Sequence, residues 1–365
     1  MSAKPGVRKN VLQVSDDERN DLRDAIIALN VDPKFRFSGN RDDTPFVGGV
    51  TYWFKQDEIH QATHVHRGPA FLTWHRELCN RFERLLRLVN PNVSLHYWNW
   101  NEDPKALFTN KFMGNSQGEA GDPWATAMFY NPNVASENYR GIDPFDLEHS
   151  NPADPPLILT RERQDGSLIE FLIKYNEEHQ DKIPIYSDKE IVESDTFPKM
   201  RSKLETMHNY AHGYIGGTIG DPHISFRDPF VFLIHSNVDR LFSAWQLRKG
   251  FEWRLKPEEV YGEEKNTQAL GSTHPYIIVG INTMLSPWCG VGYPYEKEVL
   301  KAEQGEEPGV NDVRPWTYPE NWHRDPDRYP DERPKNSLDK SIVTPTLYDS
   351  FPDGFEYNYA KAGRL

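Results

Sequence analysis

Residues 66–89 read HRGPAFLTWHRELCNRFERLLRLV and carry a strong helical pattern. Apolar residues and one histidine recur there at steps of three and four: Phe71, His75, Leu78, Phe82, Leu85 and Val89. This spacing places all six on one face of an α-helix. Pro69 suits a first helical turn and Asn90-Pro91 ends the pattern. The stretch therefore predicts a helix with one histidine on its buried face.

Three further segments predict helices that each bring histidine to an inward face. Residues 197–212 form one, which Gly213 is expected to end. Another opens at Asp228-Pro229, an N-cap followed by proline in the first turn, and residues 52–63 form the last. We predict a mainly α fold in which a central four-helix bundle holds a metal site and long loops surround it. Residues 1–45 are interpreted as a lead-in arm with a helix at 16–29, and residues 101–195 as loops apart from a helix near 167–178.

The histidines of these segments form two sets of three. The six candidate metal ligands are His60, His66, His75, His208, His212 and His235. His208 and His212 lie four residues apart, so their imidazoles share one helix face and can meet one ion. A lone helical histidine is more often an ordinary core or surface residue, but six of them in similar helical settings favour ligands. His64 is the alternative to His60; we prefer His60, whose setting is helical and whose distance from His66 leaves room for a turn.

The ligand type indicates the metal. Neutral imidazole suits copper, zinc and iron, whereas zinc and iron sites usually add a carboxylate or thiolate. The predicted inward positions supply histidine alone, which favours copper. Three imidazoles for each ion leave coordination positions open for dioxygen.

The same residues carry a family resemblance. Residues 66–76, continuing to Arg81-Phe82-Glu83, resemble the first copper signature of tyrosinases and other type-3 copper proteins. Residues 207–212 (MHNYAH), Gly216-Gly217 and residues 228–240 resemble the second signature, and Tyr293-Pro294-Tyr295 resembles the tyrosine motif that closes the catalytic domain. The resemblance covers about residues 50–295.

Two departures from the family pattern refine the resemblance. Ile234 stands where many relatives have the first histidine of a His-His pair, which leaves His235 as the ligand there. No cysteine lies near His60 or His64, although many fungal and plant members cross-link one to a copper A histidine. The sequence is therefore more similar to a bacterial-type tyrosinase.

The resemblance implies two copper ions, dioxygen as co-substrate, and small phenols as substrates. The implied reactions are ortho-hydroxylation of monophenols and oxidation of o-diphenols to o-quinones. The alternatives are a catechol oxidase or o-aminophenol oxidase without monophenolase activity, a haemocyanin-like oxygen carrier, and an unrelated di-metal hydrolase, which would need carboxylate ligands.

Monophenol chemistry requires loss of the phenolic proton, and free phenols have pKa values near 10. We predict that Glu205 and Asn209, four residues apart on one helix, hold a water between carboxylate and amide for this step; the alternative is a solvated pair without a role. Relatives with this pair tend to hydroxylate monophenols. Asp239 is expected to orient a ligand or its neighbour, or else to pair with Arg240 or another base.

The surroundings of the predicted site suggest an open mouth. Gly213 follows the second copper B histidine and offers no side chain where some relatives have a bulky or basic group. The loop 215–227, with Ile219, Pro222 and His223, is predicted to border substrate access, His223 as a rim residue rather than a ligand. Trp98 and Trp100 are interpreted as core aromatic residues.

Composition excludes several function classes. A net charge of −13 and a pI near 5.5 disfavour nucleic acid and anionic membranes as partners. The two cysteines exclude a disulfide scaffold, and residues 1–13 contain no apolar run of signal-peptide length. These features predict a cytoplasmic protein, with export alongside a carrier protein as an alternative.

We predict a catalytic domain over residues 1–295, with its core at about 50–295, and a proline-rich extension over 296–365. The extension is expected to pack on the domain or to shield its active site. Its aromatic residues Phe351, Phe355, Tyr357 and Tyr359 motivate the shielding hypothesis.

Overall fold

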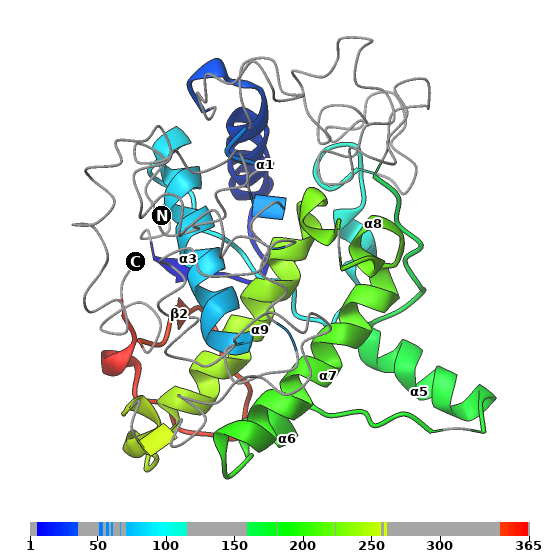
Figure 1. Cartoon of the computed structure of the whole chain (residues 1–365), viewed down its shortest axis with the longest axis vertical. Coiled ribbons are helices and arrows are strands. Elements are labelled where there is room, and N and C mark those ends of the chain that lie inside the picture. Colours follow the sequence, from blue (N-terminus) through cyan, green and yellow to red (C-terminus); the bar gives the residue numbers. More distant parts are fainter. Residues whose placement is uncertain are drawn as a thin grey trace, which may run out of the picture.

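The computed structural model describes residues 6–35, 51–53, 56–57, 60, 66, 71–114, 159–180, 182–222, 224–256, 259–260 and 344–363. Within these ranges the chain is mainly α-helical, as predicted (Figure 1). The α-helices are α1 (Asp16–Val31), α3 (Phe71–Val89), α5 (Leu168–Glu178), α6 (Asp188–Val192), α7 (Phe197–Ile215), α8 (Gly217–Gly220) and α9 (Phe230–Leu247). The short 3₁₀ helices are η1 (Pro33–Phe35), η2 (Pro104–Leu107), η5 (Ser225–Arg227), η6 (Glu252–Leu255) and η11 (Tyr359–Lys361).

Helix α9 forms the centre of the fold. All of its residues are buried, and it packs against α3 on one side and α7 on the other (Figure 1). A helix that is buried all round needs apolar side chains on every face, and residues 230–234, FVFLI, supply them. Phe82 of α3 stacks on Phe232 of α9 with ring centroids 3.7 Å apart. The three predicted histidine-bearing helices that the structure describes are thus neighbours.

The N-terminal segment belongs to the core rather than to a loosely attached arm. Helix α1 packs on α3 and buries Leu22, Ile26 and Leu29 completely or almost completely. Ser15 caps α1 and accepts from the Glu18 amide, while Glu18 reaches back to the Ser15 amide, which is a capping box. The predicted helix at 16–29 is confirmed and extends two residues further.

Two predicted helix ends differ in detail. Helix α7 continues through Gly213 and ends at Gly216, whose φ of 63° only glycine adopts easily. An exposed glycine can stay helical when the following residues, here Tyr214 and Ile215, are buried. Helix α9 begins at Phe230 with Pro229, rather than the predicted Asp228, at the N-cap position; the Asp228 carboxylate, one residue earlier, accepts from the Phe230 amide at 2.9 Å. Helix α5 has the expected bounds and a capping box at Ser167.

The two ends of the described chain meet beside the bundle. Strand β1 (Val7–Arg8) pairs in parallel with β2 (Leu347–Tyr348), Val7 opposite Leu347 and Arg8 opposite Tyr348. Tyr348 and Phe351 are part of the hydrophobic core. The described residues 344–363 therefore pack against the helical core.

A buried ion-pair network fastens these strands to α3 and α9. Arg8 binds Glu83 of α3 at 2.9 Å and Asp239 of α9 at 3.0 Å, and Arg76 of α3 also pairs with Asp239. Burial would raise the pKa of Asp239, but the Arg76 and Arg8 guanidinium groups lower it. The Tyr348 hydroxyl lies 2.9 Å from Asp239 Oδ2, and burial raises the pKa of this tyrosine. Four segments distant in sequence are thus joined through one carboxylate.

The aromatic residues that motivated an active-site shield lie elsewhere. Phe351 contacts Tyr357 and Tyr359, and the Arg248 guanidinium at the end of α9 lies over Phe355. The Asn358 amide donates to the carbonyl of Leu247, the last residue of α9. These side chains therefore cover the C-terminal end of α9 rather than the histidines. Residues 296–343 and Tyr293-Pro294-Tyr295 lie outside the described residues.

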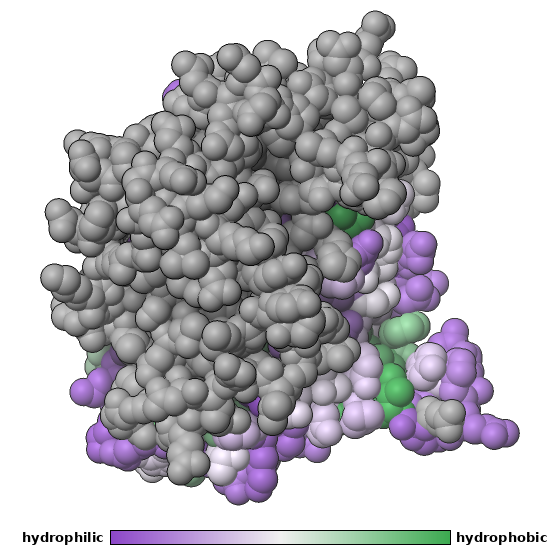
Figure 2. Space-filling model, viewed as in Figure 1, coloured by the Kyte–Doolittle hydropathy of each residue, from purple (hydrophilic) through white to green (hydrophobic). Residues whose placement is uncertain are grey.

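The described helices lack a candidate membrane span, since none combines the necessary length with sufficient apolar character. Figure 2 shows that the described surface on this face is largely hydrophilic, with hydrophobic residues where α5 leaves the body of the molecule.

Trp98 and Trp100 are fully buried, which confirms their prediction as core residues.

Candidate metal centre

The described residues include two groups whose side chains are placed to hold a metal ion. One consists of His60, His66 and His75, and the other of His208, His212 and His235. In each group the candidate ligand atoms all lie within 4.8 Å of one another. Both groups contain histidine alone.

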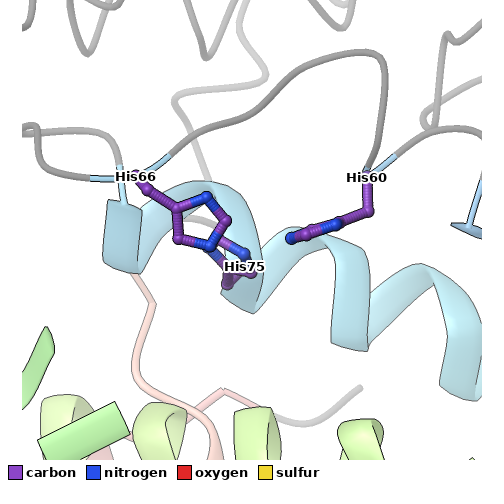
Figure 3. A group of neighbouring side chains, drawn as sticks. All are labelled: His60, His66 and His75. Carbon is purple, nitrogen blue, oxygen red and sulfur yellow. The ribbon is translucent and has the colours of Figure 1, made fainter. Parts of the chain in front are cut away.

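The first triad joins α3 to the segment that precedes it. His75 lies in the first half of α3, and its Nδ1 donates to the Phe71 carbonyl one turn earlier, at 2.8 Å. His60 and His66 come from before the helix, and the three imidazoles point toward a common centre (Figure 3). Their ring centroids are 5.2 Å (His60–His66), 5.2 Å (His66–His75) and 5.6 Å (His60–His75) apart. His64 lies outside the described residues.

The second triad is formed by two adjacent helices. His208 and His212 project from one face of α7, and His235 faces them from α9. The Nε2 atom of His235 lies 3.3 Å from Nε2 of His208 and 3.4 Å from Nε2 of His212. The spacing of four residues within α7 therefore brings two imidazoles to one point, as predicted.

The two triads adjoin each other. His75 and His235 stack with ring centroids 4.4 Å apart and planes 6° from parallel. His66 and His208 stack at 5.9 Å. This contact follows from the packing of α3 on α9 and α7, so two ions bound by the triads would be neighbours in one pocket.

In the second triad, hydrogen bonds fix which nitrogen of His208 and of His212 faces the centre of the site. His212 Nδ1 donates to the Ile219 carbonyl at 2.8 Å, and His208 Nδ1 lies 3.0 Å from Asn209 Oδ1. An imidazole that donates through Nδ1 keeps its lone pair on Nε2. In the second triad, lone pairs of His208 and His212 are therefore directed at His235 Nε2, an arrangement that a cation would stabilise.

Burial keeps these imidazoles neutral. Desolvation lowers the pKa of His75 to about 3 and that of His212 to about 4. Desolvation, together with the neighbouring histidines, lowers the pKa of His208 and His235 well below the usual value. Among the described residues, none forms a hydrogen bond with the buried Nε2 of His75. A buried lone pair without a donor and a set of neutral imidazoles both fit a bound metal ion.

Aromatic rings enclose the pocket at positions that sequence reasoning missed. Phe226, fully buried in η5, stacks on His60 at 4.2 Å and contacts His235 at 5.1 Å. Phe71 contacts His75 at 4.8 Å and His208 at 4.9 Å. In the sequence, Phe71 was visible only as a member of a helix face. Phe226 falls within residues 215–227, which were predicted to border substrate access, but no pattern there singled it out as a wall of the site.

The predicted proton-transfer pair lies on α7 with His208 and His212. Glu205 is buried, and its carboxylate lies 3.4 Å from the Arg201 guanidinium. Asn209 is exposed and accepts from His208 through Oδ1, which leaves its amide N–H groups as donors. Asn209 therefore also determines the tautomer of a ligand histidine. Asp239 pairs with Arg76 and Arg8 rather than with Arg240, which binds Asp188.

The residues predicted to border substrate access take different positions. Gly213 is exposed, and a Cβ built there would meet nothing within 4 Å. Pro222 is exposed, whereas the Ile219 side chain is fully buried, so Ile219 contributes its carbonyl oxygen to His212 rather than an exposed side chain. His223 lies outside the described residues.

A helical core with two adjoining triads of imidazole ligands defines a binuclear site of the type-3 copper class. The sequence model of the tyrosinase family, described as the common central domain of tyrosinase, matches residues 49–248, more than half of the chain. The protein therefore belongs to the tyrosinase family. In this family the site holds two copper ions, and the donor set described above fits them.

Several known proteins are similar to this chain. A tyrosinase from Streptomyces lincolnensis is 28% identical over 254 residues, covering 66% of this chain and 83% of that protein. A 5,6-dihydroxyindole-2-carboxylic acid oxidase from Ambystoma mexicanum is 28% identical over 217 residues, 53% of this chain and 40% of its own. This chain thus spans less than half of that oxidase. A polyphenol oxidase structure from Thermothelomyces thermophila is similar with a TM-score of 0.49 and 19% identity, covering 73% of this chain and 76% of that one.

Proposed function

We propose that this protein uses dioxygen to oxidise o-diphenols to o-quinones and to ortho-hydroxylate monophenols. The observation that carries the proposal is the pair of adjoining, all-histidine triads, with His75 stacked on His235 between them. Copper bound there would supply dioxygen binding and electron transfer, and the chain supplies geometry and access.

The proposed substrates are small phenols. Phe71 and Phe226 are fully buried and pack on the histidines, so they form the apolar wall behind the metal centre. In this proposal Gly213, one residue after His212, borders substrate access, where the open space around it leaves room for substituents on the ring.

Glu205 and Asn209 support the monophenol step. With Asn209 Oδ1 occupied by His208, its amide N–H groups remain to hold a water, and the Glu205 carboxylate one turn earlier on α7 can accept a proton through that water. A phenol with a pKa near 10 needs such a base before its oxygen can bind as phenolate.

The test compares a catechol with the matching monophenol, for example 4-methylcatechol and 4-methylphenol, on copper-loaded protein. Turnover of both supports the proposal, and turnover of the catechol alone indicates a catechol oxidase. Binding of dioxygen without turnover of either indicates an oxygen carrier, as in haemocyanin.

Variants then separate the two reactions. Glu205→Gln should lower the monophenol rate by about 100-fold or more, the usual contribution of a general base, and change the catechol rate much less. Thr206→Val is the matched control, since the Thr206 hydroxyl bonds to the Ser202 carbonyl within α7. An equal fall of both rates in Glu205→Gln, at unchanged copper content, would refute the proton-transfer role.

A further inference from the structure

A short segment outside the bundle runs along the turn that follows α7. We call residues 159–164 the strap. Its backbone amides bind the end of the helix: Glu162 donates to the Ile215 carbonyl at 2.8 Å and Gln164 to the Tyr214 carbonyl at 3.1 Å. The strap is therefore held against α7 just after His212.

The strap and α8 are joined by a reciprocal pair of threonines. The Thr218 amide donates to the Thr160 carbonyl at 2.8 Å, and the Thr160 amide donates to the Thr218 hydroxyl at 3.0 Å. Gly217, with φ of 55°, allows this approach, because a Cβ there would lie 2.2 Å from the Thr160 carbonyl oxygen. Thr218 is buried, so its bonds are sheltered from water.

This pairing determines where the next carbonyl lies. Ile219 follows Thr218, its side chain is fully buried, and its carbonyl oxygen accepts from His212 Nδ1 at 2.8 Å. Contacts therefore link the strap, through Thr218 and the Ile219 carbonyl, to His212. In this way the strap acts on the orientation of a copper B ligand. Hydrogen bonds to the distal nitrogen of a ligand histidine fix its tautomer and its aim at the metal.

The strap also reaches the other copper B helix. Arg161 binds both oxygens of Asp228, at 2.6 and 2.8 Å, and Asp228 accepts from the Phe230 amide at the start of α9. His235 lies in the second turn of that helix. One segment thus contacts the turn after α7 and the start of α9, the two helices that supply the second triad.

We propose that Thr218, held by Thr160 of the strap, is a positioning residue that sets the affinity of the copper B site through the Ile219 carbonyl and His212. This inference rests on the dicopper site and is independent of which phenol is oxidised. It predicts that copper B, and not copper A, weakens when the threonine pair is broken.

The experiment measures copper retention against a competing chelator. Thr218→Val keeps the shape of the side chain but removes the hydroxyl that Thr160 binds. This variant should lose one copper ion per chain at a chelator concentration about 10- to 100-fold lower than the concentration that the wild type needs. An effect of this size is usual when a group that supports a ligand from behind is removed. The remaining single Cu²⁺ should give a paramagnetic resonance signal that a coupled pair does not give. Thr218→Ser should restore wild-type retention.

Two further variants keep the result interpretable. Thr206→Val on the neighbouring helix α7 should retain both ions, and the unfolding midpoint of each copper-free variant shows whether it is folded. If Thr218→Val is not folded, Thr218→Ala removes the same oxygen without adding a methyl group. Wild-type copper retention in a folded Thr218 variant, or loss of both ions together, would overturn the proposal. Failure of phenol oxidation alone would leave it standing, because the readout is copper content.

Discussion

The two triads differ in what orients their helical ligands. His75 of the first donates through Nδ1 to the Phe71 carbonyl of its own helix, and His212 of the second donates to the Ile219 carbonyl beyond the end of its helix. Both bonds are 2.8 Å long. The first is local and forms whenever α3 forms, while the second depends on a turn that the strap holds in place. Similar ligand geometry can thus rest on very different parts of the chain.

The largest effect should come from removing a ligand in either triad. His75→Ala and His212→Ala should each retain one copper ion per chain. The rate of phenol oxidation should fall by about 100-fold or more, because loss of a ligand costs more than loss of a group that only hydrogen-bonds to a ligand. Copper analysis and a catechol assay measure both. Retention of two ions by either variant would contradict the assignment of the histidines to two triads.

Asp239→Asn should disturb both triads, because Asp239 ties Arg76, next to His75, to the helix of His235. Without the Asp239 carboxylate, the guanidinium groups of Arg8 and Arg76 stay buried and lose this counter-charge. The free energy of unfolding of the copper-free chain should therefore fall by about 3 kcal/mol or more. Urea unfolding measures this. Asp16→Asn, which removes an exposed ion pair with Arg19, is the control and should have little effect. Equal midpoints for the two variants would contradict the role of the network.

Tyr348→Phe should have a smaller effect of the same kind. It removes one hydroxyl that lies 2.8 Å from the Ser236 carbonyl and 2.9 Å from Asp239, but it keeps the ring in the core. We expect a loss of about 1–2 kcal/mol in the free energy of unfolding, with both copper ions retained. Loss of one ion would show that the C-terminal segment also acts on a triad.

The smallest effect on the copper site should come from His96, a buried histidine outside both triads. Burial lowers its pKa to about 4. Below pH about 6.5 the unfolded state binds a proton at His96 that the folded state does not bind. The free energy of unfolding should therefore fall as pH falls from about 6.5 to about 4, and His96 should cause no such loss above pH about 6.5. His96→Gln should flatten this part of the stability profile of the copper-free chain and retain both ions. A loss of copper in this variant would show that His96 also supports the metal centre, although it lies outside both triads.

Local sequence patterns were enough to predict helices α1, α3, α5, α7 and α9 and the six histidines that the structure brings together. Periodicity over residues 71–89, the four-residue step from His208 to His212 and the bond between Asp228 and the Phe230 amide are short-range features, because helix faces and helix starts depend on neighbours within a turn. The continuation of α7 past Gly213 was not predictable in this way, since burial of Tyr214 and Ile215 outweighs the low helix propensity of glycine.

Several contacts that hold those ligands depend on long-range packing. The stacking of His75 on His235, the wall formed by Phe226, the meeting of Arg8 and Tyr348 at Asp239 and the strap behind His212 all join residues far apart in the chain. No local pattern encodes such contacts, because they arise when separate elements pack into one core. Short-range spacing therefore identifies the ligands. Their orientation depends partly on local hydrogen bonds, as at His75, and partly on distant segments that pack behind them, as at His212.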